Sequence, residues 1–176
     1  MLTMRLCLDP VLREVAVPVA VVDDALRAVL VEMVQLMDAQ NGAGLAAPQV
    51  GISKRFIVMR DVCDQGKRDG PNRTPVLKMI NPRIVARSAE MTTGEEGCLS
   101  VLGPDDLPVY ADVTRPVEVT VEWTDENGVM RVREFTGIAA RIVQHECDHL
   151  DGVLFIDRLP AVKREMVMNK VKKRKN

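Results

Sequence analysis

The sequence predicts an α+β fold, built from two long helices and several antiparallel strands in one domain. Three patterns carry that prediction. Apolar residues keep a period near 3.6 over 24–40, as on an amphipathic helix. Apolar and polar residues alternate strictly over 117–123 and an Asn127-Gly128 turn follows, as in a β-hairpin. A second helical pattern, over 137–150, places Ile138 and Ile142 on one face.

Composition favours an aliphatic core and a cytoplasmic protein. Hydrophobic residues make up 47% of the 176 residues, but aromatic residues only 3%. No apolar run approaches the roughly 20 residues that span a bilayer, and the N-terminus lacks a signal-peptide pattern. The four cysteines form no Cys-x-x-Cys pair, so we expect no disulfide. Cys7 and Cys63 are expected to be small buried apolar residues.

In the first half of the chain, Asp23 or Asp24 can cap the helix over 24–40, and Asn41-Gly42 supplies the left-handed residue that ends it. A Gly/Ala-rich turn and a strand at 55–60 come next. The polar stretch 61–75 is expected to be a mobile loop. Strands are then predicted at 76–80 and 83–88.

In the second half, the strand over 117–123 pairs with a strand that continues through about Phe135. Thr136 can cap the helix from 137 to about 150, and Gly152 ends it. Residues 153–156 form a short apolar run. Pro160 then opens a final helix.

The most informative feature is the placement of the only two histidines, His145 and His149, in a His-Glu-x-x-His motif. On a helix, residues four apart lie on the same face, so both imidazoles can bind one metal ion. Glu146 follows the first histidine and can act as a general base toward a water molecule at the metal.

A catalytic metal site normally needs a third protein ligand. The metzincin pattern places a histidine at 155, but Phe155 stands there. Glu165 could serve, although it lies in a basic helix where a solvated role is commoner. Cys98, in the segment EGCLS at 96–100, is the better candidate. Cys147 should point away from the metal-binding face.

A third informative segment is GAGLAAPQ at 42–49. Its glycines, Gly42 and Gly44, permit a close approach of the main chain to a ligand. Gln49 offers an uncharged amide donor. A helix-terminating loop would explain Gly42 equally well. No Gly-Lys-Ser/Thr follows, so we exclude a phosphate-binding loop of the Walker type.

Together, GAGLAAPQ, EGCLS and QHECDH at 144–149 resemble the three motifs of the peptide deformylase family, in the family's order. Jointly the three are specific, whereas the last alone is not. The resemblance continues in DPVLR at 9–13, QVGISKR at 49–55, INP at 80–82 and LDGVLF at 150–155. It therefore covers nearly the whole chain.

The resemblance implies one catalytic domain over 1–176, in which antiparallel sheets pack around a central metal-binding helix. An N-terminal helix and a basic C-terminal helix at 160–176 complete it. The implied enzyme hydrolyses the N-formyl group from the formyl-methionine of newly synthesised polypeptides and releases formate. The implied metal ligands are Cys98, His145 and His149. Ferrous iron is the expected metal, with Zn²⁺, Ni²⁺ or Co²⁺ also able to bind, although the ligand types alone would indicate zinc.

The same resemblance implies catalytic roles for Glu146, Gln49 and Leu99. Glu146 takes the proton from water and returns it to the leaving amine. The Gln49 amide and the Leu99 backbone N–H donate to the formyl oxygen as its negative charge grows.

A substrate-binding set is expected on both sides of the cleft. Gly44 and its neighbour Gly42 offer a main-chain edge against which an extended peptide can pair. Ala43, Ile138 and Ile142 line the methionine pocket.

The chain departs from the family pattern after Ser100, where VLGPDDLPVYADVTR fills 101–115. We expect a longer loop there that borders the cleft and affects preference beyond methionine. Arg115 best matches the arginine that the family has in this region. Arg141 is expected to be solvated or salt-bridged.

Charge is concentrated at the C-terminus. Residues 163–176 contain seven basic residues and one acid, a formal charge of +6, and the rest of the chain carries −7 because the total is −1. Such a helix is usually solvated, but in the family it can dock on the ribosome. The expected partners are formyl-methionyl nascent peptides, without membrane or DNA.

Three other functions stay open from the residues alone. They are a general metalloprotease, a cysteine hydrolase that uses Cys98 with a histidine base, and a non-catalytic metal-binding module. A base at Glu146 argues against the last, since a structural site needs none.

Overall fold

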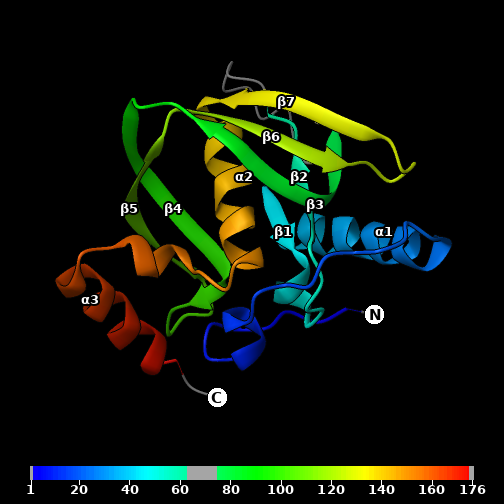
Figure 1. Cartoon of the computed structure of the whole chain (residues 1–176). Helices are drawn as coiled ribbons and strands as arrows, with labels where there is room; N and C mark the ends of the chain where they lie inside the picture. Colours follow the sequence, from blue (N-terminus) through cyan, green and yellow to red (C-terminus); the bar gives the residue numbers. More distant parts are fainter. Residues whose placement is uncertain (1, 63–74, 175–176) are drawn as a thin grey trace.

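Two antiparallel sheets lie on either side of one helix, α2 (Gly137–Leu150) (Figure 1). The structure is a computed structural model that describes residues 2–62 and 75–174. The larger sheet has the strand order β1-β2-β3-β6-β7, and the smaller pairs β4 with β5. All neighbouring strands run antiparallel. The predicted α+β class, with sheets around a central helix, is confirmed.

Helix α1 (Asp24–Ala39) forms as the periodicity predicts. The Asp23 side chain accepts a hydrogen bond from the Leu26 N–H at 2.8 Å, which caps the first turn. Asn41, with φ 53°, is the left-handed residue that ends the helix. The buried face of α1, with Leu30, Met33 and Met37, covers strands β1 and β2.

The Gly/Ala-rich stretch is more regular than the predicted turn. It contains strand β1 (Gly44–Ala46) and a 3₁₀ turn, η2 (Ala47–Val50), before β2 (Phe56–Arg60). Because β1 is an edge strand with β2 as its neighbour, its other edge remains available.

The two strands predicted on either side of 81–82 are one strand, β3 (Val76–Arg87). Its register with β6 shifts between Ile80 and Arg83, at Asn81, whose φ is 51°. The Asn81 side chain bonds both the N–H and the carbonyl of Val19 at 2.8 Å, which holds the irregularity. The predicted mobile loop and the predicted burial of Cys63 fall on 63–74, outside the described residues.

The loop prediction for 101–115 is wrong. Strand β4 (Met91–Leu102) and strand β5 (Pro108–Pro116) form a hairpin, and only a short turn separates them. Thr93 and Thr114 pair across it with their hydroxyls 2.8 Å apart. Most of the residues at 101–115 therefore belong to a hairpin beside α2 (Figure 1).

The second predicted hairpin is present as β6 (Glu118–Thr124) and β7 (Met130–Thr136), which lead into α2. Thr136 occupies the N-cap position of α2, but its side chain makes no capping hydrogen bond. Gly152, with φ 72°, follows the helix end as predicted.

The chain finishes with a 3₁₀ turn, η3 (Phe155–Arg158), and helix α3 (Ala161–Lys172). The helix is shorter than the predicted 160–176. Val167 and Val171 bury its inner face against the β4–β5 hairpin, in a core cluster that also contains Cys7. Among the described residues, no helix is both long and apolar enough to cross a membrane.

Candidate metal centre and substrate cleft

Helix α2 and strand β4 bring three potential metal ligands together. His145 and His149 stand one turn apart on α2, with ring centroids 5.1 Å apart. Cys98 reaches them from β4, and its Sγ lies 3.3 Å from the His149 Nε2. One ligand atom from each of the three lies within 4.8 Å of the others. All three side chains are buried.

Strand β4 is shaped to present Cys98. The β4–β5 pairing stops at Gly97 and resumes at Leu102, so the main chain between them leaves the ladder. Gly97 must be glycine, because a Cβ there would lie 2.5 Å from the Tyr110 ring. The Ser100 N–H donates to the Cys98 Sγ at 3.4 Å and helps to hold the sulfur in place.

The two weaker candidates for the third ligand lie elsewhere. Glu165 is exposed on α3 and is absent from the cluster of ligand atoms. Cys147 packs in the core between α2 and the larger sheet. Burial raises the pKa of its thiol to about 12, so it stays protonated at neutral pH.

The donor set fits one divalent metal ion. His145 holds its Nδ1 3.0 Å from a Glu96 carboxylate oxygen, which leaves Nε2 for a metal. Burial and the nearby cationic groups lower the pKa of His149, so its ring remains neutral and keeps a lone pair. A cysteine with two histidines is a ligand set that zinc and iron both accept.

Glu146 faces the same space. Its side chain is buried, and Oε2 has no hydrogen-bond partner among the described residues. A Cβ on Gly44 would lie 2.4 Å from Oε1, so only glycine in β1 allows the carboxylate this position. Burial raises the pKa of Glu146 to about 7. Such a group exchanges protons readily near neutral pH.

Gln49 is fixed by η2 and by β4. Its Oε1 accepts from the Ala46 N–H at 2.8 Å, which orients the amide. Its Nε2 donates to the Ser100 Oγ at 3.2 Å and lies 3.6 Å from the Cys98 Sγ. The amide therefore points its donor hydrogens toward the ligand cluster.

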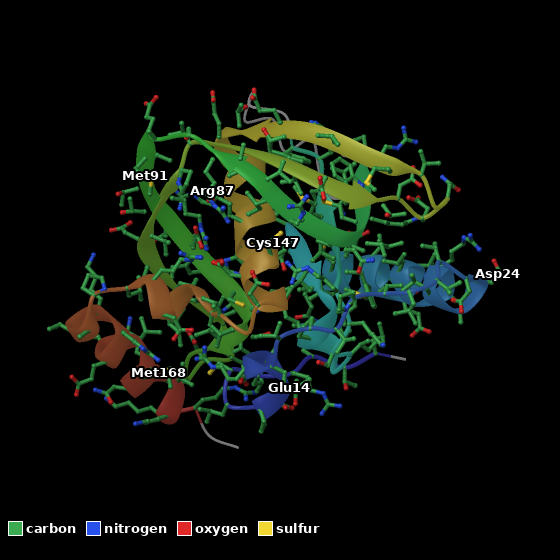
Figure 2. All side chains as sticks on the ribbon, viewed as in Figure 1. Glu14, Asp24, Arg87, Met91, Cys147 and Met168 are labelled. Carbon is green, nitrogen blue, oxygen red and sulfur yellow. The ribbon has the colours of Figure 1, made fainter. Side chains whose placement is uncertain are left out.

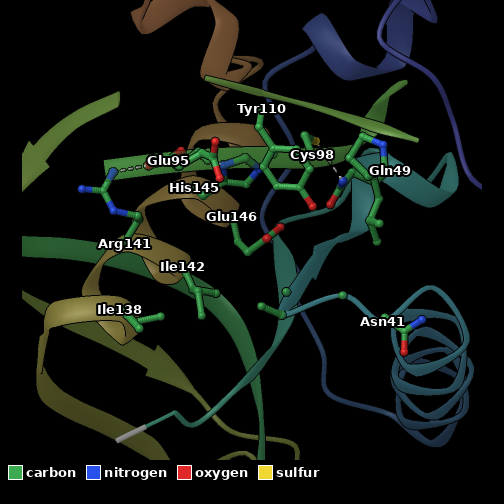
Figure 3. Close-up of a pocket in the computed structure, with 17 residues that line it drawn as sticks. Asn41, Gln49, Glu95, Cys98, Tyr110, Ile138, Arg141, Ile142, His145 and Glu146 are labelled. Carbon is green, nitrogen blue, oxygen red and sulfur yellow. Dashed lines mark hydrogen bonds and ion pairs between the residues drawn. The ribbon is translucent and has the colours of Figure 1, made fainter. Parts of the chain in front are cut away.

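A cavity of about 230 Å³ joins these groups, far more than one water molecule needs (Figure 3). Every residue predicted for the site lines this cavity except His149. His149 is buried and belongs to the group of potential metal ligands with Cys98 and His145. The lining residues that were not predicted as part of the site are Asn41, Glu95, Glu96, Gly97, Pro108, Tyr110 and Arg141. The residues predicted to line it are Gly42, Ala43, Gly44, Gln49, Cys98, Leu99, Ile138, Ile142, His145 and Glu146.

Sequence reasoning gave no role to Glu96, which supports the site from behind. Burial opposes its charge, but the Arg115 guanidinium bonds both carboxylate oxygens, at 2.6 and 2.8 Å, and the net effect lowers its pKa well below the usual range. Arg141 donates a further hydrogen bond to Glu96 at 2.8 Å, which is the kind of salt bridge predicted for it. Arg115 also reaches Asp148 on α2 at 2.9 Å. No local pattern signalled this role, because Glu96 and His145 are 49 residues apart in the chain.

Comparison with known proteins gives one family. The model of the family "Polypeptide deformylase" matches residues 1–165. A peptide deformylase of Synechocystis sp. is 49% identical over 151 residues, which is 86% of this chain and 75% of the relative. One from Rhizobium meliloti is 43% identical over 165 residues, or 94% of this chain and 88% of the relative.

Solved structures agree. A peptide deformylase from Synechococcus elongatus, in complex with actinonin, superposes with a TM-score of 0.84 at 39% identity and covers 98% of this chain and 86% of that one. A Met-Ala-Ser-bound class I type b enzyme from Acinetobacter baumannii superposes with a TM-score of 0.78 at 38% identity, with coverages of 90% and 98%.

Proposed function

The chain belongs to the peptide deformylase family, and from that premise we propose how its own residues carry out the reaction. It is a metal-dependent hydrolase that removes the N-formyl group from the N-terminal formyl-methionine of newly synthesised polypeptides and releases formate. The observation that carries this function is the Cys98, His145 and His149 cluster at the base of a cleft that also contains Glu146.

Cys98, His145 and His149 hold one divalent metal ion in this proposal. When bound, the metal supplies a positive charge that lowers the pKa of water beside it and polarises the formyl oxygen. Ferrous iron is the native metal we propose, with Zn²⁺, Ni²⁺ or Co²⁺ as substitutes. Glu96 orients His145 through its bond to Nδ1.

Glu146 acts as the general base. Its unpartnered Oε2 can take a proton as water attacks the formyl carbon. The carboxyl then passes that proton to the departing amine as the C–N bond breaks. Gly44 supports this role, because the space that it leaves is the space the carboxylate occupies.

Gln49 and Leu99 stabilise the negative charge that grows on the formyl oxygen. The Gln49 amide is already oriented by its bond from Ala46, so little reorganisation is needed during the reaction. Leu99 lines the cleft and lies where the β4–β5 pairing is interrupted, which supports the proposal that its backbone N–H donates to the substrate and not to β5. One such donor typically accounts for about 3–4 kcal/mol of the barrier.

The peptide lies in the cleft between β1 and β4. Gly42 and Gly44 offer backbone groups at the open edge of β1, against which an extended peptide can pair. Ala43, Ile138 and Ile142, which line the cleft, form the apolar slot for methionine. Figure 3 labels Ile138 and Ile142 on α2. Ile138 is 51% exposed, so the substrate side chain would cover apolar surface that is otherwise open to water.

The cellular setting that we propose is N-terminal processing in the cytoplasm during protein biosynthesis, by a single domain over 1–176. The substrate is the formyl-methionyl nascent peptide, without membrane or DNA as partners.

A ribosome contact through α3 is part of this proposal. Lys170, Lys172 and Lys173 are exposed, whereas Arg174 is engaged with Asp106 at 2.5 Å. Replacing the three lysines by Gln should reduce ribosome co-sedimentation at low salt and leave turnover of a free peptide unchanged. Unchanged co-sedimentation would rule out a contact through these lysines.

The experiment that tests the function is formate release from a formyl-Met tripeptide, with the acetyl-Met tripeptide as control. We expect rapid release from the first and none from the second. Cleavage of internal bonds in a blocked, unformylated peptide would instead favour a general metalloprotease. Formate release that survives chelation but stops on alkylation would favour a cysteine hydrolase built on Cys98.

A further inference from the structure

A second cavity, of about 170 Å³, lies along the flank of α2 that carries Gln144 and Asp148, next to the face that carries the metal cluster. It opens where β3 passes into β4, between the two sheets, and shares no lining residue with the substrate cleft. Gln144 and Asp148 of α2 face it, whereas His145 and Glu146 face the cleft. Three arginines, Arg87, Arg115 and Arg158, also line it.

Positive charge exceeds negative charge around this cavity. Arg115 and Arg158 both bond Asp148, and Arg115 shares Glu96 with Arg141. Three guanidinium groups therefore share two carboxylates in this network. Among the residues that line the cavity itself, Arg87, Arg115 and Arg158 stand against one carboxylate, Asp148, which leaves an excess of two positive charges.

Of the three arginines that line the cavity, Arg87 is the one without an ion pair among the described residues. Its side chain is exposed at the end of β3, next to Met91 of β4 (Figure 2). Within residues 2–62 and 75–174, no hydrogen bond or ion pair reaches its guanidinium. It also borders a shallow hollow that contains Glu118 and Glu134, but it pairs with neither of these acids.

We propose that this cavity binds a small oxyanion, a phosphate or a carboxylate group, held chiefly by Arg87 with Arg158 and Arg115 beside it. Guanidinium groups bind such anions through paired N–H donors, and the charge excess supplies the attraction. The volume admits an anion of several heavy atoms. Asp148 already holds the buried Arg115 and the more exposed Arg158, so this part of the site is formed before the anion arrives.

The test is calorimetric titration of the metal-loaded protein with inorganic phosphate and, separately, with formate, at constant ionic strength in chloride. The Arg87→Gln variant removes the free cation and, being exposed and unpaired, should fold normally. Lys54→Gln removes the same charge from an exposed lysine outside the cavity. The Nε–Hε resonances of Arg115 and Arg158, followed by NMR, report where the anion binds.

We expect saturable binding of at least one anion, shifts of both arginine resonances, and about fivefold weaker binding in Arg87→Gln, as for loss of one partly exposed charged contact. Lys54→Gln should bind within about twofold of the wild type. Binding by phosphate alone or formate alone would identify the source. Absence of saturation, or affinity unaffected by Arg87→Gln, would overturn the proposal, and the latter would assign the anion to the metal.

Discussion

The two faces of helix α2 use the same kinds of side chain for opposite purposes. On the cleft face, Glu146 Oε2 and His149 Nδ1 are buried without partners among the described residues. On the neighbouring face, Asp148 is bonded by Arg115 and Arg158, and Gln144 donates to the carbonyls of α2 and β5. Polar groups on the first face are left without hydrogen bonds and are available for a reaction. Polar groups on the second face form hydrogen bonds that hold the helix in place.

This difference indicates why a face with unpartnered polar groups needs a neighbouring face whose polar groups are fully hydrogen-bonded. An unpartnered buried polar group costs free energy, so it persists only where the rest of the structure fixes it. Glu96 connects the two faces, since it bonds both His145 and Arg115. Substitutions on the two faces should therefore fail in different ways, in chemistry on one face and in stability on the other.

The largest effect should come from the cleft face. Glu146→Gln keeps the shape of the side chain but removes the proton acceptor, so we expect turnover to fall by about 10²- to 10⁴-fold. Metal content, measured by elemental analysis, should remain at the wild-type level. Glu95→Gln is the matched control, because this exposed carboxylate also lines the cleft. Loss of metal in Glu146→Gln would give Glu146 a structural role instead.

Substitutions on the neighbouring face of α2, around Arg115 and Asp148, should instead lower the stability of the fold. Arg115→Leu removes two hydrogen bonds from Glu96 and one from Asp148 in a buried setting, and should lower the free energy of unfolding by about 3–5 kcal/mol. Urea unfolding measures this. Arg83→Leu removes an exposed ion pair with Glu122 and should cost less than about 1 kcal/mol. Equal losses in the two variants would contradict the importance given to the buried network.

Glu96→Gln should affect both faces through His145. The amide oxygen can still accept from Nδ1, but the charge that strengthens the histidine as a ligand is lost. We expect metal affinity to fall about 10- to 100-fold, measured by competition with a chelator. Glu95→Gln, one residue away, should bind metal as the wild type does. Identical affinities for both variants would remove Glu96 from the support of the metal site.

The smallest effect is expected far from α2, at the β6–β7 turn. Partial burial opposes the charge of Asp125, but bonds from the Val129 N–H, the Arg131 guanidinium and the Asn127 N–H outweigh it, and the pKa is lowered. The contribution of Asp125 to stability is thus complete above the ordinary pKa of 3.8 and is lost as pH falls through the folded value.

Asp125→Asn should therefore be less stable than the wild type at neutral pH by under about 1 kcal/mol. The difference should shrink as the pH falls below 4, because the wild-type carboxylate is then protonated. Urea unfolding of both proteins between pH 6 and pH 3 checks this, since acid effects on all other groups are common to both. A gap that widens toward acid pH would reverse the assigned sign.

Local patterns allowed much of the fold and half of the site to be predicted. The spacing of His145 and His149 fixes their common face on a helix without reference to distant residues. The Asn127-Gly128 turn likewise fixes the β6–β7 hairpin. Cys98 could be chosen as the third ligand only by elimination and resemblance.

The β4–β5 hairpin could not be predicted because its signals are not local. Gly103, Pro104 and the adjacent acids read as a loop, although the strands on either side pair over most of their length. The role of Glu96 depends on Arg115, which is 19 residues away, and on Arg141, which is 45 away. Only the folded chain brings these side chains together around His145.

The central claim, that one metal held by Cys98, His145 and His149 supports deformylation, is tested most directly by metal titration. Protein stripped of metal by a chelator would be titrated anaerobically with Fe²⁺ while formate release from a formyl-Met tripeptide is followed. We predict no release without metal, and a rise that saturates at one metal per chain. Formate release by the metal-free protein, or saturation only at a second metal, would contradict the account.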